Sequence, residues 1–352
     1  MEFQDIYSDF NLKEIEEKVQ DLFPQWKFSF FQLVKEVYEG EKKGILELFF
    51  ERVKEAFVSE LQGIKEVFIT IVIIILIASV FHVFKDFFQN YQIAEISFYI
   101  NYLMLIIILT NLFSTILDIG ENTLRTMEEF MRIFFPTYFL IVGNTVGKGT
   151  GLAYYQIAGG VIYLVEWCLV SFLLPSLSAY MLFVLMNGIW EEDRLSLLLE
   201  LFQKAIKFLL KIMLGCLTGA SMIQSMIVPM IDRVKGEAVY QAVESIPGIG
   251  EVTEGALRIW LGSAVLIKNS VGIVGCLLLL ILCAIPLIKI LITGCLLKMT
   301  AAILGIVGDK KMIKCTNHVG DGIFMIFQTV CYGILFFLVL VAITIYITNG
   351  GV

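Results

Sequence analysis

Long uncharged stretches alternate with short polar ones along most of this chain. Each of the longest is rich in Ile, Leu, Val and Phe and lacks a formal charge. A hydrocarbon core of roughly 30 Å is crossed by about 20 helical residues. Stretches of spanning length are Val67 to Phe84, Ile96 to Leu117, Trp167 to Trp190, Ile212 to Ile231, Asn269 to Ile288 and Gly322 to Val352. The pattern therefore predicts transmembrane helices at these places.

Three further apolar stretches are interrupted. Ile133 to Gly147 contains Pro136, Gly149 to Val165 contains two adjacent glycines, and Ile290 to Val307 contains Lys298. Each is either a full span, a half-helix or a helix in the interface. Lipid offers no partner to an open backbone group, and the runs are too long for barrel strands. We therefore expect an all-α polytopic bundle with about seven to nine membrane segments.

The polar segments suggest how the chain is organised. Residues 1–66 are predicted to form a polar, amphipathic helical region, and residues 67–352 the membrane domain. Phe50, Val53 and Phe57 recur at helical spacing, which favours packing on a neighbouring helix or on the membrane surface. Residues 191–211 and 232–268 are expected to be amphipathic connectors, and the second of these has a re-entrant hairpin as its alternative.

Composition supports lipid as the solvent of this chain. Hydrophobic residues make up 58% and charged residues 17%, and the mean hydropathy is +0.83. A soluble fold with this composition would expose far more apolar surface than is usual. The net charge of −7 also argues against a nucleic-acid partner, since phosphate binding needs clustered Lys and Arg. The run of Lys310, Lys311 and Lys314 marks the best cytoplasmic segment under the positive-inside rule.

No catalytic constellation is found in the sequence. The seven cysteines form no Cys-x-x-Cys pair, and six of them lie in apolar runs where Cys behaves as a small hydrophobe. Of the two histidines, His82 ends an apolar stretch and His318 is placed in a polar loop. Gly147 to Gly151 lacks the spacing of a phosphate-binding loop. We expect no enzyme activity, no cofactor and no metal site.

Charges within the apolar stretches are the candidate functional residues. Glu166 interrupts an otherwise uncharged run, and is either an intramembrane carboxylate or the mark of a turn. Lys289 and Lys298 either extend to one interface or face a polar cavity in the bundle. Pro136, Pro175 and Pro286 lie inside apolar stretches, where proline favours a kink. Many small residues indicate close helix packing, within the chain or in a homo-oligomer.

The C-terminal third resembles a known family. Ser263-Ala264-Val265-Leu266-Ile267-Lys268-Asn269-Ser270-Val271-Gly272-Ile273 leads into a span that ends Ala284-Ile285-Pro286-Leu287-Ile288-Lys289-Ile290, and Lys298-Met299-Thr300-Ala301-Ala302-Ile303-Leu304 follows. This sequence is similar to that of stage III sporulation protein AE of endospore-forming bacteria. The order of the earlier spans, with Pro136 and the turn at Ile246 to Gly250, also fits. The resemblance covers about residues 60–350.

The resemblance implies a function and partners. Members of this family are expected in the mother-cell membrane around the forespore, together with the other stage III A-operon proteins and stage II sporulation protein Q. They form a channel, or feeding tube, needed for late forespore gene expression, and look like permeases. The alternative is a non-conducting scaffold that assembles partner subunits. Members commonly begin with a secretory signal, whereas Met1 to Phe30 lacks a continuous apolar core.

Overall fold

The computed structural model describes residues 30–39, 54, 69, 72–73, 91–146, 159–161, 163–165, 167–189, 195–216, 219, 250–305 and 310–349. Within these ranges the chain is helical, apart from turn residues at Leu195 and Gly305, and contains no strand. The prediction of an all-α fold is confirmed.

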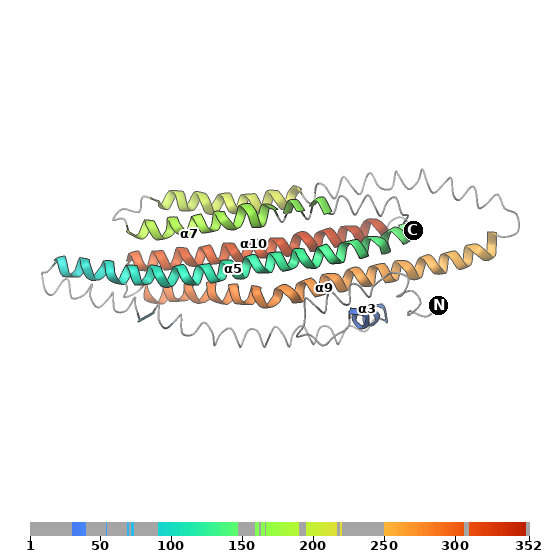
Figure 1. Ribbon diagram of the computed structural model, residues 1–352, viewed down its shortest axis with the longest axis horizontal. Helices are drawn as coiled ribbons and strands as arrows, with labels where there is room; N and C mark the ends of the chain where they lie inside the picture. Colours follow the sequence, from blue (N-terminus) through green and yellow to red (C-terminus); the bar gives the residue numbers. More distant parts are fainter. Residues whose placement is uncertain are drawn as a thin grey trace.

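Three long helices run side by side along the molecule (Figure 1). They are α5 (Tyr91–Val146), α9 (Gly250–Leu304) and α10 (Lys310–Asn349), with 56, 55 and 40 residues. At 1.5 Å per residue they are about 84, 82 and 60 Å long, which is well beyond a hydrocarbon core of about 30 Å. Each helix therefore has room for a membrane crossing and for a polar extension.

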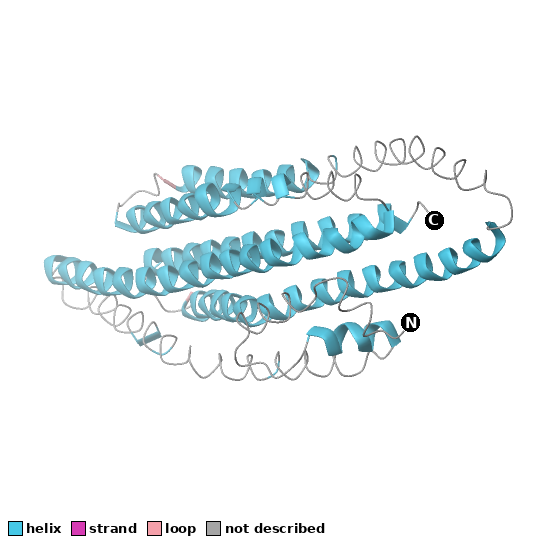
Figure 2. Ribbon diagram, turned by 45° about the vertical axis from the view of Figure 1, so that its right-hand side comes forward, coloured by secondary structure: helices cyan, strands magenta, loops and turns pink. Residues whose placement is uncertain are grey.

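A second group of helices covers α5 and α10 on the side away from α9, as both overall views show (Figures 1 and 2). It contains the π-helix η1 (Trp167–Leu173), α7 (Leu174–Ile189) and a helix over residues 196–216. α10 and α5 contact each other, and each of them also contacts α9, α7 and η1, so these two helices form the centre of the bundle. The Asn187 amide oxygen accepts a hydrogen bond from the Leu195 N–H at 3.0 Å, which satisfies a backbone donor where the next helix begins.

Aromatic side chains on one face of α5 form much of the core. Phe130, Phe134 and Tyr138 follow one another at four-residue spacing, with ring centroids 5.7 and 5.3 Å apart, and all three are fully buried.

Near the N-terminus of the chain, α3 (Phe30–Glu39) contacts α9 and buries Leu33 and Val34. α3 lies within residues 1–66, the rest of which falls almost entirely outside the described residues.

Close contacts at glycines fix the relative register of α9 and α10. A Cβ on Gly294 would lie 3.2 Å from Ile323, and one on Gly272 would lie 2.8 Å from Ile345. The two helices therefore run antiparallel, and the residue numbers at facing positions add up to about 617.

The same contacts orient α5. On α9, a Cβ on Gly275 would overlap the ring of Phe134, and one on Gly272 would lie 3.0 Å from the Tyr138 hydroxyl. α5 is therefore antiparallel to α9. On α10, Gly322 meets Phe113 and Gly333 meets Leu124, so α5 is parallel to α10 with an offset of about 209 residues.

The number of spans differs from expectation. Among the described residues, four helices are long and apolar enough to cross a membrane: Tyr99–Val142, Gly159–Gly188, Lys268–Ile303 and Lys310–Ile345. The stretches at 96–117 and 133–146 are parts of one helix, α5, and those at 269–288 and 290–304 are parts of α9. The count of seven to nine is not confirmed. Most residues of the stretches at 67–84, 149–165 and 212–231 lie outside the described residues.

Predicted segments join into longer helices for a physical reason. Residues 118–132 carry six charges and separate two of the predicted apolar stretches. Arg125 and Arg132 each pair with a glutamate four residues earlier, an arrangement that stabilises a helix. In the same way, residues 250–268 belong to α9 and continue directly into its apolar part, where a separate connector was expected.

Candidate functional site

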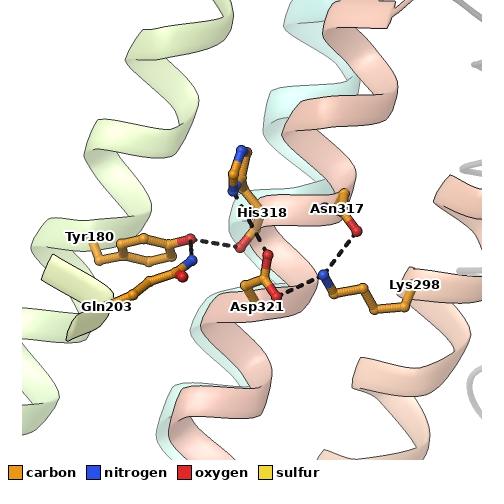
Figure 3. Close-up of polar contacts among 6 residues, drawn as sticks. All are labelled: Tyr180, Gln203, Lys298, Asn317, His318 and Asp321. Carbon is orange, nitrogen blue, oxygen red and sulfur yellow. Dashed lines mark hydrogen bonds and ion pairs between the residues drawn. The ribbon is translucent and has the colours of Figure 1, made fainter. Parts of the chain in front are cut away.

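Lys298 on α9 and Asp321 on α10 form an ion pair between the two helices. The Lys298 Nζ lies 2.7 Å from Asp321 Oδ1 and donates a hydrogen bond of 2.8 Å to Asn317 Oδ1 (Figure 3). The side chains of Lys298 and Asp321 are 28% and 34% exposed, so the pair is partly withdrawn from solvent. One ammonium group therefore connects two turns of α10 to the end of α9.

A second set of polar contacts joins this pair to the α7 side of the bundle (Figure 3). The His318 Nδ1 lies 3.8 Å from Asp321 Oδ2. The backbone carbonyl of His318 accepts a hydrogen bond of 3.2 Å from the Tyr180 hydroxyl, which in turn accepts one of 2.8 Å from Gln203 Nε2. Polar groups from α7, the 196–216 helix, α9 and α10 thus lie at one level of the molecule.

Two glycines of α10 leave the space that this cluster needs. A Cβ on Gly320 would lie 3.1 Å from Cγ of Lys298, and one on Gly322 would lie 2.9 Å from Phe113 and 3.3 Å from Tyr180. Without side chains at these positions, the aliphatic stem of Lys298 crosses α10 closely on one side, and Tyr180 packs on the other. The Gly-Asp-Gly sequence at 320–322 is therefore explained by packing.

The cluster also marks a boundary along α10. Asp321 is the last charged residue of the chain, and everything from Gly322 onward is uncharged. On the other side lie Lys310, Lys311 and Lys314. A partly buried ion pair contributes little net stability compared with an apolar pair, but the loss of one partner leaves a costly uncompensated charge. Such a pair is suited to holding two helices in one relative position.

Of the predicted site residues, Lys298 is the one that the structure places in this cluster. Its ammonium group contacts Asp321 and Asn317 of the neighbouring helix. Lys289 is half-buried on α9, at a level that the register places near Gln328 of α10. Glu166 lies outside the described residues. Roles of these three residues in a pore stay predictions.

The three prolines lie in helices that continue past them. Pro136 and Pro286 are inside α5 and α9, and Pro175 is the second residue of α7, directly after the π-helix η1. A proline cannot donate its backbone hydrogen bond, and its ring crowds the carbonyl four residues earlier. Bending of the helix axis at these prolines stays a prediction.

Sequence reasoning missed most of the cluster. His318 was placed in a polar loop, which is wrong, because it lies within α10. Asp321, Asn317, Tyr180 and Gln203 were not singled out. One signal was available: a lysine in an apolar stretch needs a carboxylate, and Asp321 is one of the few carboxylates near the following apolar run.

The fold and this site define a class of protein. Four of the described helices are long and apolar enough to span a bilayer, and two of them are connected through an ion pair, as in a helical integral membrane protein. The family described as stage III sporulation protein AE matches residues 28–348. Stage III sporulation protein AE of Bacillus subtilis (strain 168) is 21% identical over 284 residues, which are 80% of this chain and 70% of that protein. No solved structure matches the chain.

The family match covers most of the chain, so the protein belongs to the stage III sporulation protein AE family. Membership assigns it a role in sporulation and confirms the resemblance found in the sequence. The family is one of sporulation membrane proteins and is not a known family of enzymes.

Proposed function

We propose that this protein is a membrane subunit of a channel between mother cell and forespore. In this proposal it lies in the mother-cell membrane around the forespore, with residues 67–352 as its membrane domain. Its partners are the other stage III A-operon proteins and stage II sporulation protein Q. The channel supports late forespore gene expression and spore development.

The observation that carries the proposal is the interhelical pair of Lys298 and Asp321, seen in a protein of this family. Lys298 and Asp321 lie within two of the candidate membrane spans, Lys268–Ile303 and Lys310–Ile345. Charges inside membrane spans are costly, and where they occur they commonly serve transport or gating. The pair holds α9 against α10 at the level where the uncharged part of α10 begins. We therefore assign it the role of fixing the α9–α10 hairpin in a conducting arrangement.

The test replaces the endogenous gene with variants in a sporulating strain. Lys298→Met and Asp321→Leu are made singly and together, and late forespore transcription is followed with a reporter. Removing one charge is expected to reduce both reporter activity and the amount of protein in the membrane, because the other charge is stranded. The double variant is expected to restore the amount of protein and to leave the reporter at least about tenfold low.

Lys204→Met supplies the matched control. Lys204 forms an exposed pair with Glu200 within one helix at 2.7 Å, so its loss should leave the reporter unchanged. Co-purification of partner subunits is measured in parallel. A double variant that is present in the membrane but no longer retains partners would support the scaffold and contradict conduction. Normal reporter activity in the double variant would also contradict the proposal.

A further inference from the structure

One face of α5 carries an unbroken stripe of polar residues. Along it the spacing alternates between four and three residues, so the side chains lie above one another on a single face. All of its members are exposed, and they are Asn111, Thr115, Asp118, Asn122, Arg125, Glu129 and Arg132. We call this set the α5 polar stripe. From first to last it covers 21 residue steps, about 32 Å, close to the thickness of a hydrocarbon core.

The register of the bundle places this stripe beside the apolar parts of its neighbours. With an offset of about 209, residues 111–132 of α5 lie level with about 320–341 of α10, where Asp321 is followed by uncharged residues only. The residue numbers at facing positions of the antiparallel helices α5 and α9 add up to about 410. The same segment of α5 therefore lies level with about residues 278–299 of α9. The stripe is thus at the depth of the uncharged part of α10 and of a part of α9 in which Lys289 and Lys298 are the charged residues.

Other outward faces at that depth are apolar. On α9, Leu280, Leu291 and Met299 are 37, 38 and 55% exposed. On the opposite side of the bundle, Phe172 of η1 and Leu182 of α7 are 53 and 62% exposed. These faces suit contact with lipid chains. The polar stripe on α5 does not, although it lies at the same level.

The charges of the stripe are partly neutralised within the helix. Arg125 donates hydrogen bonds of 2.9 and 2.7 Å to Glu121, and Arg132 pairs with Glu128. Segment 118–132 has four carboxylates and two arginines, so a net charge of −2 is left. The side chains of Arg125 and Arg132 are still 53 and 74% exposed. Ionised side chains facing hydrocarbon each cost several kcal/mol, so water or protein must cover this face.

A dry contact between two copies of this face is disfavoured by symmetry. Copies inserted with the same orientation are related by an axis normal to the membrane, so each residue meets itself at the same depth. A closed seam would then place Arg125 against Arg125 and Asp118 against Asp118, and like charges in contact are destabilising. Rings of like charges separated by water are, by contrast, common linings of pores.

From this geometry we propose that the α5 polar stripe lines a water-filled path through the membrane, on the outer face of α5. Because Glu121 and Glu128 neutralise Arg125 and Arg132, Asp118 and Glu129 leave segment 118–132 with a net charge of −2. The path therefore admits small hydrated solutes, cations and zwitterions in preference to anions. This inference deepens the proposed channel function and rests on it for conduction. The presence of water along the stripe is a separate and directly measurable claim.

The test measures the reactivity of single cysteines in the full-length protein in membrane vesicles. The background retains only the buried Cys283 and Cys315. Cysteine is introduced at Thr115, Asn122 or Glu129, and each variant is treated with a cationic and an anionic methanethiosulfonate. The native Cys295 is exposed on α9 and level with Thr115, so restoring it alone gives a control at the same depth on a lipid-facing side. Leu280→Cys is a second such control.

The stripe positions are expected to react at least about tenfold faster than Cys295 and Leu280→Cys, since these reagents need a hydrated thiolate. Relative to a free thiol in solution, the cationic reagent should be favoured over the anionic one at Asn122. Stripe cysteines that react as slowly as Cys295 would overturn the inference. A second outcome would also overturn it. If the stripe cysteines react slowly with the reagents but form disulfides efficiently, between copies or with another segment of this chain, the stripe lies in a dry contact.

One further variant separates this inference from the proposed function. Asn122→Trp places a bulky ring in the middle of the stripe and should reduce late forespore transcription, with the protein still in the membrane. If the stripe is labelled rapidly and Asn122→Trp leaves transcription intact, the hydrated face stands and the channel assignment falls. If labelling is slow and the Lys298–Asp321 double variant remains inactive, the channel stands and the path lies elsewhere.

Discussion

The charges of the α9–α10 hairpin and those of α5 lie beside similar apolar stretches, but the former pair between helices and the latter within one helix. Lys298 and Asp321 point toward each other across two helices, and the pair is partly buried. On α5, Arg125 and Arg132 pair with glutamates of their own helix and remain on the outer face. The first arrangement connects two helices, whereas the second lies within one helix.

This difference indicates two different functions for charge at membrane depth. An interhelical pair depends on the tertiary structure and is lost when the helices separate. An intrahelical pair forms wherever the helix forms, so it can lie on a face that no other helix covers. In our interpretation the hairpin charges hold the bundle in place, and the α5 charges provide a surface for water.

The largest effect on stability is expected from Lys298→Ala. It leaves Asp321 without its ammonium partner in a site that is about two-thirds buried, and should lower the free energy of unfolding by about 2 kcal/mol. The measurement is the midpoint of thermal or denaturant unfolding in detergent. A double-mutant cycle with Asp321→Ala should give a coupling energy of about 1 kcal/mol or more, and a value near zero would show that the pair is not formed.

A somewhat smaller effect is expected at the contact that sets the depth of α5. Gly275→Ala forces the Phe134 ring to move, and overpacking of this kind costs about 1–2 kcal/mol. Gly215→Ala is the matched control, since a Cβ there meets nothing within 4 Å and alanine is the better helix former. Equal effects of the two substitutions on the unfolding midpoint would contradict the α5–α9 register.

Tyr180→Phe probes the link between the two halves of the cluster. It removes the hydrogen bond to the His318 carbonyl and the acceptor used by Gln203, at a cost of about 1 kcal/mol. The ring itself stays and continues to pack. An unchanged unfolding midpoint would mean that the α7 side is held by packing alone.

The smallest effect is expected from Arg125→Leu on the stripe. The pair with Glu121 is exposed and lies within one helix, so its loss should change the free energy of unfolding in detergent by at most about 0.5 kcal/mol. A loss as large as that of Lys298→Ala would remove the distinction between the two kinds of charge. It would indicate that Arg125 holds a neighbouring segment in place.

Some features of this protein were accessible from the sequence because they depend on composition over about 20 residues. Uncharged stretches of spanning length define an all-α membrane protein whatever their arrangement, since lipid demands internal backbone hydrogen bonds. The residue sequence of the C-terminal third likewise indicated the family. These features require no knowledge of which residues meet in space.

The tertiary structure alone decided how the charges are used. A local count of charges does not distinguish a loop from a helix with pairs at four-residue spacing, so the apolar stretches on either side of residues 118–132 were predicted as separate segments, although both belong to α5. The same limit applies to Lys298, whose partner Asp321 is brought to it by the antiparallel return of α10. Solvent preference is a property of each stretch by itself, whereas the pairing of charges and the depth of a polar face depend on the register between helices.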